Sequence, residues 1–310
     1  MTAGGASAPG KALLCGEYAV LEGAPAVVTA VDRRALASWG AEAAALPPEV
    51  LATLERANRQ VGPFDQPLII DVDPLRQGGT KLGLGSSAAA AVAAAGAVFN
   101  RGGLDIGDDQ TRAALFSCAF EGHAAVAPAG SGVDVAASTY GGFLRCVRVD
   151  GRLAIDRIEV TPTVEIRFVW TGHAARTSDL LAVVHKLRDR DPDTYRRRMA
   201  ALAETAERFA DAFEDERPGP IIDEAEAYAH AMEALGHDSG APIVEDRLRM
   251  TAEVARAHGG SAKPCGAGGG DVAVAFFAAA EQASRFEGAC REAGLTPLDL
   301  TLGAPGVTPC

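Results

Sequence analysis

The most constraining feature of this sequence is an uninterrupted apolar segment, Ala88 to Phe99, that directly follows the glycine-rich residues K-L-G-L-G-S-S at 81–87. The segment is rich in alanine and has no polar face, so it predicts a helix that is buried on all sides. It is too short to cross a bilayer, which needs about 20 apolar residues. The pattern therefore predicts a core helix that begins at a glycine-rich loop.

The loop before this helix has the composition of a phosphate-binding site. Gly83 and Gly85 allow the backbone to approach a phosphate closely, and the helix start offers N–H groups and the positive end of its dipole. Ser86 and Ser87 can cap the helix, or can reach a phosphate oxygen or Mg²⁺, and Lys81 adds a full positive charge. The alternative is a serine-capped core helix without a ligand.

Two better-known phosphate motifs do not fit this loop. The P-loop pattern is absent, because no lysine follows the second glycine. The dinucleotide fingerprint fits only in part, as Gly83-x-Gly85-x-x-Ala88, and it should directly follow a buried strand. Residues 78–81, G-G-T-K, precede it here, so an NAD(P)-dependent oxidoreductase is disfavoured.

Two further glycine-rich segments lie near the two ends of the chain. The first, residues 9–23, places Lys11 between an expected flexible turn and a strand, where its charge can project into a cleft. The second, residues 263–271, has four glycines in five positions and runs into a strand expected at 271–277. Such a loop is entropically costly, which indicates close approach to a ligand or tight packing between lobes.

Charge and cysteine usage exclude several classes of protein. The chain has 310 residues, with 29 lysines and arginines against 41 aspartates and glutamates, and a formal charge of −12. Such an acidic protein is a poor general binder of nucleic acid or anionic membranes. Six scattered cysteines without metal-ligand spacing indicate reduced thiols, and residues 1–10 lack the features of a signal peptide. We therefore expect a cytoplasmic protein.

The alternation of strand-like and helical patterns predicts an α+β fold with two lobes. The first, residues 1–155, mixes short strands with glycine turns and the core helix. The second, residues 156–310, combines a sheet with a layer of helices and ends in a short strand expected near 298–302.

The three glycine-rich segments together resemble the motifs of the GHMP kinase superfamily, in the expected order and across most of the chain. They read P-G-K-A-L-L-C-G-E-Y-A-V-L, K-L-G-L-G-S-S-A-A and K-P-C-G-A-G-G-G-D. The resemblance implies an ATP- and Mg²⁺-dependent kinase of small molecules. It also implies a first lobe like domain 2 of ribosomal protein S5 and a ferredoxin-like second lobe with added helices.

Within the superfamily, two segments resemble the phosphomevalonate kinases. Residues 130–136 read G-S-G-V-D-V-A, and residues 170–177 read W-T-G-H-A-A-R-T. The chain departs from that family at Cys265, where serine is usual, and in its rather short length. The resemblance implies phosphorylation of a small anionic substrate, most simply 5-phosphomevalonate, in the mevalonate route to isoprenoids.

The resemblance also implies roles for individual residues. Asp134 is expected to be the catalytic base or an orienting group, with electrostatic support from Lys11. The ATP phosphates would be bound by Lys81, Gly83, Leu84, Gly85, Ser86 and Ser87. The substrate would contact Lys11, Ser131, Gly132, Gly266, Ala267 and Gly268. Ser87 is the expected Mg²⁺ ligand, and Glu121 is a weaker candidate. His123 is as consistent with packing as with function.

Several alternatives remain at this point. The chain could be a mevalonate kinase or another GHMP kinase, a diphosphomevalonate decarboxylase, or a non-catalytic nucleotide-binding protein. We expect no nucleic-acid or membrane partner. We expect the protein to be a monomer or a homodimer. The cationic residues Lys186, Arg188, Arg190, Arg196, Arg197 and Arg198 could favour an anionic substrate, but charged helix runs are usually solvated surfaces, and aspartates interleave with this one.

Overall fold

The computed structural model describes residues 4–41, 45–160 and 162–310. The chain forms two compact units, and each is discontinuous in sequence. The first unit contains residues 1–12, 28–144 and 301–310, and the second contains residues 13–27 and 145–300. The domain limits expected from the sequence, 1–155 and 156–310, treat each lobe as one continuous segment and stay a prediction.

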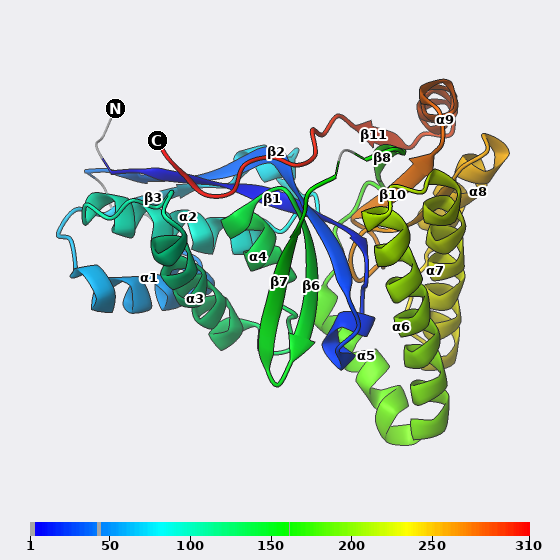
Figure 1. Ribbon diagram of the computed structural model, residues 1–310, viewed down its shortest axis with the longest axis horizontal. Coiled ribbons are helices and arrows are strands. Elements are labelled where there is room, and N and C mark those ends of the chain that lie inside the picture. Colours follow the sequence, from blue (N-terminus) through cyan, green and yellow to red (C-terminus); the bar gives the residue numbers. More distant parts are fainter. Residues whose placement is uncertain (1–3, 42–44, 161) are drawn as a thin grey trace. The chain divides into compact units, whose positions relative to one another are not determined.

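The first unit combines a sheet with helices (Figure 1). Strand β12 pairs with β1, β1 lies next to β2, and β3 pairs with β2 in antiparallel register. In Figure 1, the helices α1 to α4 gather on one side of β1, β2 and β3. The elements are β1 (Ala6–Cys15), β2 (Ala26–Trp39), α1 (Pro48–Val61), β3 (Leu68–Asp71), η2 (Asp73–Leu75), β4 (Arg76–Gln77), β5 (Thr80–Lys81), α2 (Ser86–Arg101), α3 (Asp109–Val126), α4 (Val133–Tyr140) and β12 (Thr308–Pro309). The last residues of β1 and the first of β2 belong to the second unit.

Helix α2 is the core of the first unit, as the apolar segment predicted. Every residue from Ala88 to Phe99 is buried, and α2 contacts the strands β3 and β12 and the helices α1, α3 and α4. The small side chains permit close packing. A Cβ added at Gly96 would lie 2.8 Å from Val307 Cγ2 and 3.0 Å from Ala6 Cβ. The helix can therefore be surrounded on all sides only because it has almost no side-chain bulk.

The second unit contains a β-hairpin, a four-stranded antiparallel sheet and several helices. The sheet order is β11-β8-β10-β9, and α7, α8 and α9 contact its strands. The elements are η1 (Ala19–Glu22), β6 (Phe143–Val149), β7 (Arg152–Ile158), β8 (Glu165–Trp170), α5 (Thr177–Arg190), α6 (Pro192–Glu214), α7 (Pro218–Ser239), α8 (Asp246–Ala257), β9 (Ser261–Pro264), β10 (Val272–Phe277), α9 (Ala280–Glu292) and β11 (Thr296–Leu298). The first two residues of β6 belong to the first unit.

This sheet order confirms the ferredoxin-like expectation. When the strands β8, β9, β10 and β11 are numbered one to four in chain order, they lie in the sheet in the order four, one, three, two. One helical crossover, α9, joins β10 to β11. The other crossover, between β8 and β9, consists of the four helices α5 to α8. The core under α8 and α9 combines small and aliphatic side chains with two aromatic rings, those of Phe277 and Phe286, whose centroids are 4.9 Å apart. The α+β fold class predicted from the sequence is confirmed.

Two local expectations were wrong. Pro9 and Gly10 do not form a turn, because they lie inside β1. A Cβ at Gly10 would approach Leu84 O to 2.7 Å, so the glycine permits close packing against the loop before α2. The strand expected at 298–302 is β11 at 296–298, Leu302 forms only an isolated bridge with Val31, and the last strand of the chain is β12.

No helix in the described part of the chain is long and apolar enough to cross a membrane.

Two glycine-to-alanine substitutions should separate packing from helix propensity. A Cβ at Gly122 in α3 would lie 2.7 Å from the backbone of Thr53 in α1, whereas at Gly288 in α9 it would meet nothing within 4 Å. Gly122→Ala should lower the free energy of unfolding by about 1–3 kcal/mol through overpacking. Gly288→Ala should raise it by about 0.5–1 kcal/mol. Equal effects in urea denaturation would contradict the α1–α3 packing.

Candidate active site

The glycine-rich loop of the first unit ends at the start of α2. Gly83 and Gly85 have φ values of +80° and +73°, which only glycine adopts readily, and Gly85 is the residue before the helix. No side chain caps this helix start. Ser86 and Ser87 are therefore the first helical residues rather than caps, and the first backbone N–H groups of α2 have no side-chain acceptor within the described chain.

Lys11 lies on β1 and holds this loop at two points. Its backbone N–H donates to Leu84 O at 2.9 Å, and its Nζ donates to Gly83 O at 3.3 Å. A Cβ at Gly85 would lie 2.9 Å from Lys11 Cγ. The space that a side chain at residue 85 would fill is thus bordered by the lysine stem. Lys11 is placed to present its charge at the N-terminus of α2.

Asp134 lies in the first turn of α4, a second helix that begins at a glycine. Gly132 precedes the helix with φ +84°, and a Cβ there would lie 2.2 Å from the ring of Phe120. Asp134 Oδ1 accepts a hydrogen bond from the N–H of Val135 at 2.9 Å, and Ser131 Oγ accepts a long one from Val133. A Cβ at Gly85 would lie 3.7 Å from Asp134 Cβ. The loop, Lys11 and Asp134 therefore border one region.

His123 on α3 joins this group, a role that the sequence motifs did not assign. Its Nε2 lies 3.2 Å from Ser87 Oγ and 4.0 Å from Asp134 Oδ2, and its side chain is 13% exposed. A nucleophilic Ser–His–Asp triad uses both ring nitrogens, one for each partner. Here one nitrogen faces both partners, so the cluster is not such a triad. It instead links the two helix N-termini through Ser87 and Asp134.

Two other predicted residues are not brought to this cluster. Glu121 is 66% exposed and pairs with Arg56 at 3.3 Å. Residues two apart on a helix are separated by about 200°, so Glu121 and His123 point to opposite sides of α3. Lys81 is exposed at the end of the short β4–β5 ribbon, opposite Arg76. The buried residues of α3, such as Cys118, Ala119 and Gly122, lie between Glu121 and His123 around the helix, so the sequence alone favours neither.

The electrostatics of this cluster suit an anion beside a carboxylate. Two helix N-termini and the Lys11 ammonium provide partial and full positive charge in a strongly acidic protein. Asp134 provides the one carboxylate that approaches His123 in the described structure. Across the described residues, no group of three or more His, Cys, Asp or Glu side chains could hold a metal ion unaided. A divalent cation would therefore need ligands from a bound anion.

The remaining predicted residues, Gly266 to Gly268, lie in the second unit. The N–H of Gly266 donates to Glu17 Oε1 at 3.1 Å, and Ala267 O accepts a hydrogen bond from Tyr18 Oη at 2.5 Å. A Cβ at Gly268 would lie 2.1 Å from Ile243 O, so this position requires glycine. Burial raises the pKa of Tyr18 well above its ordinary value, so its hydroxyl remains a donor.

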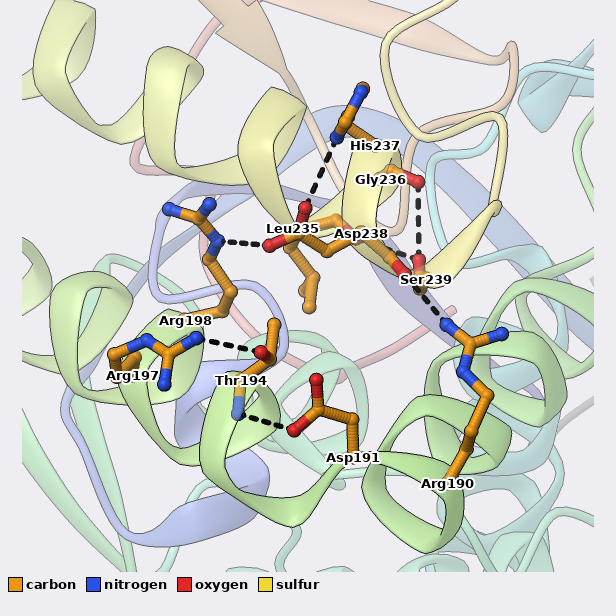
Figure 2. Close-up of polar contacts among 10 residues, drawn as sticks. All are labelled: Arg190, Asp191, Thr194, Arg197, Arg198, Leu235, Gly236, His237, Asp238 and Ser239. Carbon is orange, nitrogen blue, oxygen red and sulfur yellow. Dashed lines mark hydrogen bonds and ion pairs between the residues drawn. The ribbon is translucent and has the colours of Figure 1, made fainter.

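Several arginines of the cationic cluster on α5 and α6 are held by neighbouring polar groups, and Figure 2 shows three of them, Arg190, Arg197 and Arg198. Asp238, at the end of α7, accepts from Arg198 Nε at 2.7 Å, and its backbone O accepts from Arg190 at 2.9 Å. Arg197 donates to Thr194 Oγ1, and Arg196 pairs with Asp193. Hydrogen bonds from His237 and Arg198 hold the pKa of Asp238 below its usual value. These contacts support the interpretation of a solvated surface that joins helices.

Residues 74–142, which contain the loop, α2, α3 and Asp134, match the family described as the GHMP kinases N terminal domain. The chain is 28% identical to the phosphomevalonate kinase of Streptomyces sp. (strain CL190), with 97% of each chain covered. It is 26% identical to the mevalonate kinase of Pyrococcus furiosus, again over 97% of each chain.

A solved structure shows the same fold. The phosphomevalonate kinase of Streptococcus pneumoniae, in complex with phosphomevalonate and AMPPNP, superposes with a TM-score of 0.81. The two sequences are 21% identical, and the match covers 96% of this chain and 99% of the other. At this level of identity the likeness shows a shared fold.

Proposed function

We propose that this chain, a member of the GHMP kinase superfamily, transfers the terminal phosphoryl group of ATP to 5-phosphomevalonate and so forms 5-diphosphomevalonate. The observation that carries the proposal is the convergence of Lys11, the Gly83–Gly85 loop and Asp134 around the N-terminus of α2. The choice of acceptor is supported by the full-length similarity to a phosphomevalonate kinase and by the G-S-G-V-D-V-A segment. Mevalonate kinase is the competing assignment, since its relatives also match over the full length.

The loop fits the phosphates of a nucleotide. Glycines with positive φ at 83 and 85 leave room for close backbone approach, and the uncapped first turn of α2 supplies donors. In this proposal Leu84 and Ser86 contribute backbone contacts, and Lys11 contributes charge. Lys81 is exposed and remains a candidate for the outer phosphates.

Mg²⁺ would fit at the same glycine-rich loop and would need few ligands from the protein. This ion retains several waters and binds mainly to substrate phosphates plus one or two side chains, so a site without a group of acidic and histidine ligands is no obstacle. Bound there, it would neutralise charge on the phosphate oxygens. Ser87 Oγ is the proposed protein ligand. We leave Glu121 out, because it is exposed and paired with Arg56.

Asp134 and Lys11 are the proposed catalytic residues. Phosphoryl transfer depends mainly on positioning and on neutralising the charge of the moving group. Asp134 would accept a hydrogen bond from the acceptor, or orient it where the acceptor phosphate is already ionised. Lys11 would hold its charge near that group, since its Nζ is fixed on Gly83 O. Ser131 and Gly132, next to Asp134, are proposed to contact the same acceptor.

The cellular setting belongs to the same proposal. We assign the chain to the cytoplasm, because its six cysteines are free thiols and five of them are buried. The expectation of a monomer or homodimer stays a prediction.

The assignment of the acceptor is tested by a coupled ADP-release assay with Mg·ATP. We expect strong turnover with (R)-5-phosphomevalonate and little with mevalonate, homoserine or galactose. Preferred turnover of mevalonate would move the assignment to mevalonate kinase. Release of CO₂ from 5-diphosphomevalonate would instead identify a decarboxylase, and no turnover with any acceptor would contradict the proposal.

The role of Asp134 is tested by Asp134→Asn. The amide oxygen can still accept from the N–H of Val135, so the melting temperature should stay close to that of the wild type. The loss of the carboxylate charge should lower kcat by about a hundredfold to ten-thousandfold. A wild-type rate would remove Asp134 from the mechanism.

A pair of α3 variants distinguishes His123 from Glu121. His123→Ala removes the partner of Ser87 Oγ and should lower kcat/KM for Mg·ATP about tenfold to a hundredfold, the usual cost of losing a group that orients a metal ligand. Glu121→Ala, the matched control on the exposed side of α3, should leave kcat/KM unchanged. The reverse pattern would restore Glu121 as the metal ligand.

A further inference from the structure

A fully buried ion pair lies beside the third glycine-rich loop, defined here as Cys265–Gly270. Glu17 Oε1 and Lys263 Nζ are 2.5 Å apart, and their side chains are 1% and 0% exposed. Glu17 follows β1, and Lys263 is on β9, immediately before the loop. A buried ion pair is weak evidence for stability, because its desolvation offsets most of the attraction, and an apolar pair often serves equally well. Its presence here calls for a role beyond stability.

The pair is tied to the backbone on both sides of Cys265. Glu17 Oε1 also accepts from the N–H of Gly266 at 3.1 Å, and Lys263 Nζ also donates to Pro264 O at 2.7 Å. Glu17 itself is fixed by Tyr228 Oη, which donates to its backbone O at 2.5 Å. The two charges therefore fix where the loop begins.

The next residue, Tyr18, fixes the loop further along. Its hydroxyl donates to Ala267 O at 2.5 Å. Tyr18 has φ +61°, a conformation that non-glycine residues rarely adopt. Such strain persists only where the surrounding structure over-determines it, and it is concentrated at functional sites. Glu17 and Tyr18 thus hold Gly266 and Ala267 at adjacent positions.

Held in this way, the loop has three backbone donors without acceptors. The N–H groups of Cys265, Gly269 and Asp271 donate to Val272 O, Ile243 O and His173 O. Within the described chain, the N–H groups of Ala267, Gly268 and Gly270 have no acceptor, although Gly268 and Gly270 are buried. Buried N–H groups rarely remain unpaired. Successive N–H groups in glycine conformations of this kind form concave anion sites.

We propose that Glu17 and Lys263 are positioning residues that hold the spare N–H groups of the third glycine-rich loop in place to bind an anionic group of the reactants. The inference rests on the proposed kinase function. Neither side chain touches the reacting atoms, because both are buried, and they act through the backbone of Gly266. Glu17 Oε2 is buried and has no hydrogen-bond partner in the described structure. The carboxylate is therefore held only through Oε1, which contacts the N–H of Gly266 and Lys263 Nζ.

The test compares the single variants with a double variant. Glu17→Leu and Lys263→Met each leave one buried charge unpaired, so each should lower the melting temperature. The double variant E17L/K263M removes both charges and should recover most of that loss. It still lacks the acceptor for Gly266 N–H, so we expect its kcat to stay about a hundredfold low while KM for ATP changes little. Recovery of kcat together with stability would show a merely structural pair and overturn the inference.

A second measurement does not depend on the identity of the acceptor. Hydrogen exchange of the amides at 265–271 should be faster in E17L/K263M than in the wild type, and the milder Glu17→Gln should be intermediate. The matched control is R256M/E226L, which removes an ion pair between α8 and α7 and should change neither exchange in the loop nor kcat. Unchanged loop exchange would overturn the inference, whereas a wild type inactive on every acceptor would overturn only the proposed function.

Discussion

The first unit depends on the close packing around α2. A helix with side chains this small can be surrounded by strands and helices, and its start then lies where neighbouring backbones approach within contact distance. Gly10, Gly85 and Gly132 are each required by such an approach, because a Cβ would meet Leu84 O, Lys11 Cγ or Phe120. The same constraint that builds the core thus brings Lys11, Ser87 and Asp134 together at the helix N-termini.

In the second unit, the main constraint is to fix the conformation of the third glycine-rich loop. Glycines give backbone freedom, and that freedom must be removed again if the loop is to hold donors in place. The chain removes it with buried polar contacts from Glu17, Tyr18 and Lys263. Burying each charge costs several kcal/mol before pairing. That cost is explicable where a defined loop conformation matters more than stability.

Both sites follow one electrostatic logic. The chain is acidic overall, yet it presents backbone N–H groups at both sites, and the Lys11 ammonium at the first, where an anion is expected. By contrast, the arginines of α5 and α6, which are the densest positive segment of the sequence, are occupied by Asp193, Thr194 and Asp238. Local backbone geometry therefore locates the candidate phosphate site better than the distribution of charged residues along the chain.

The sequence by itself determined the α+β class, the buried helix at 88–99, and the loop-to-helix junction that holds Ser87, because these follow from local pattern and glycine conformation. The tertiary structure decided which residue of α3 faces Ser87. Glu121 and His123 are two residues apart, and only the packing of α3 fixes the rotation of that helix. It also decided the pairing of Glu17 with Lys263, because no local rule brings together residues 246 positions apart in the chain.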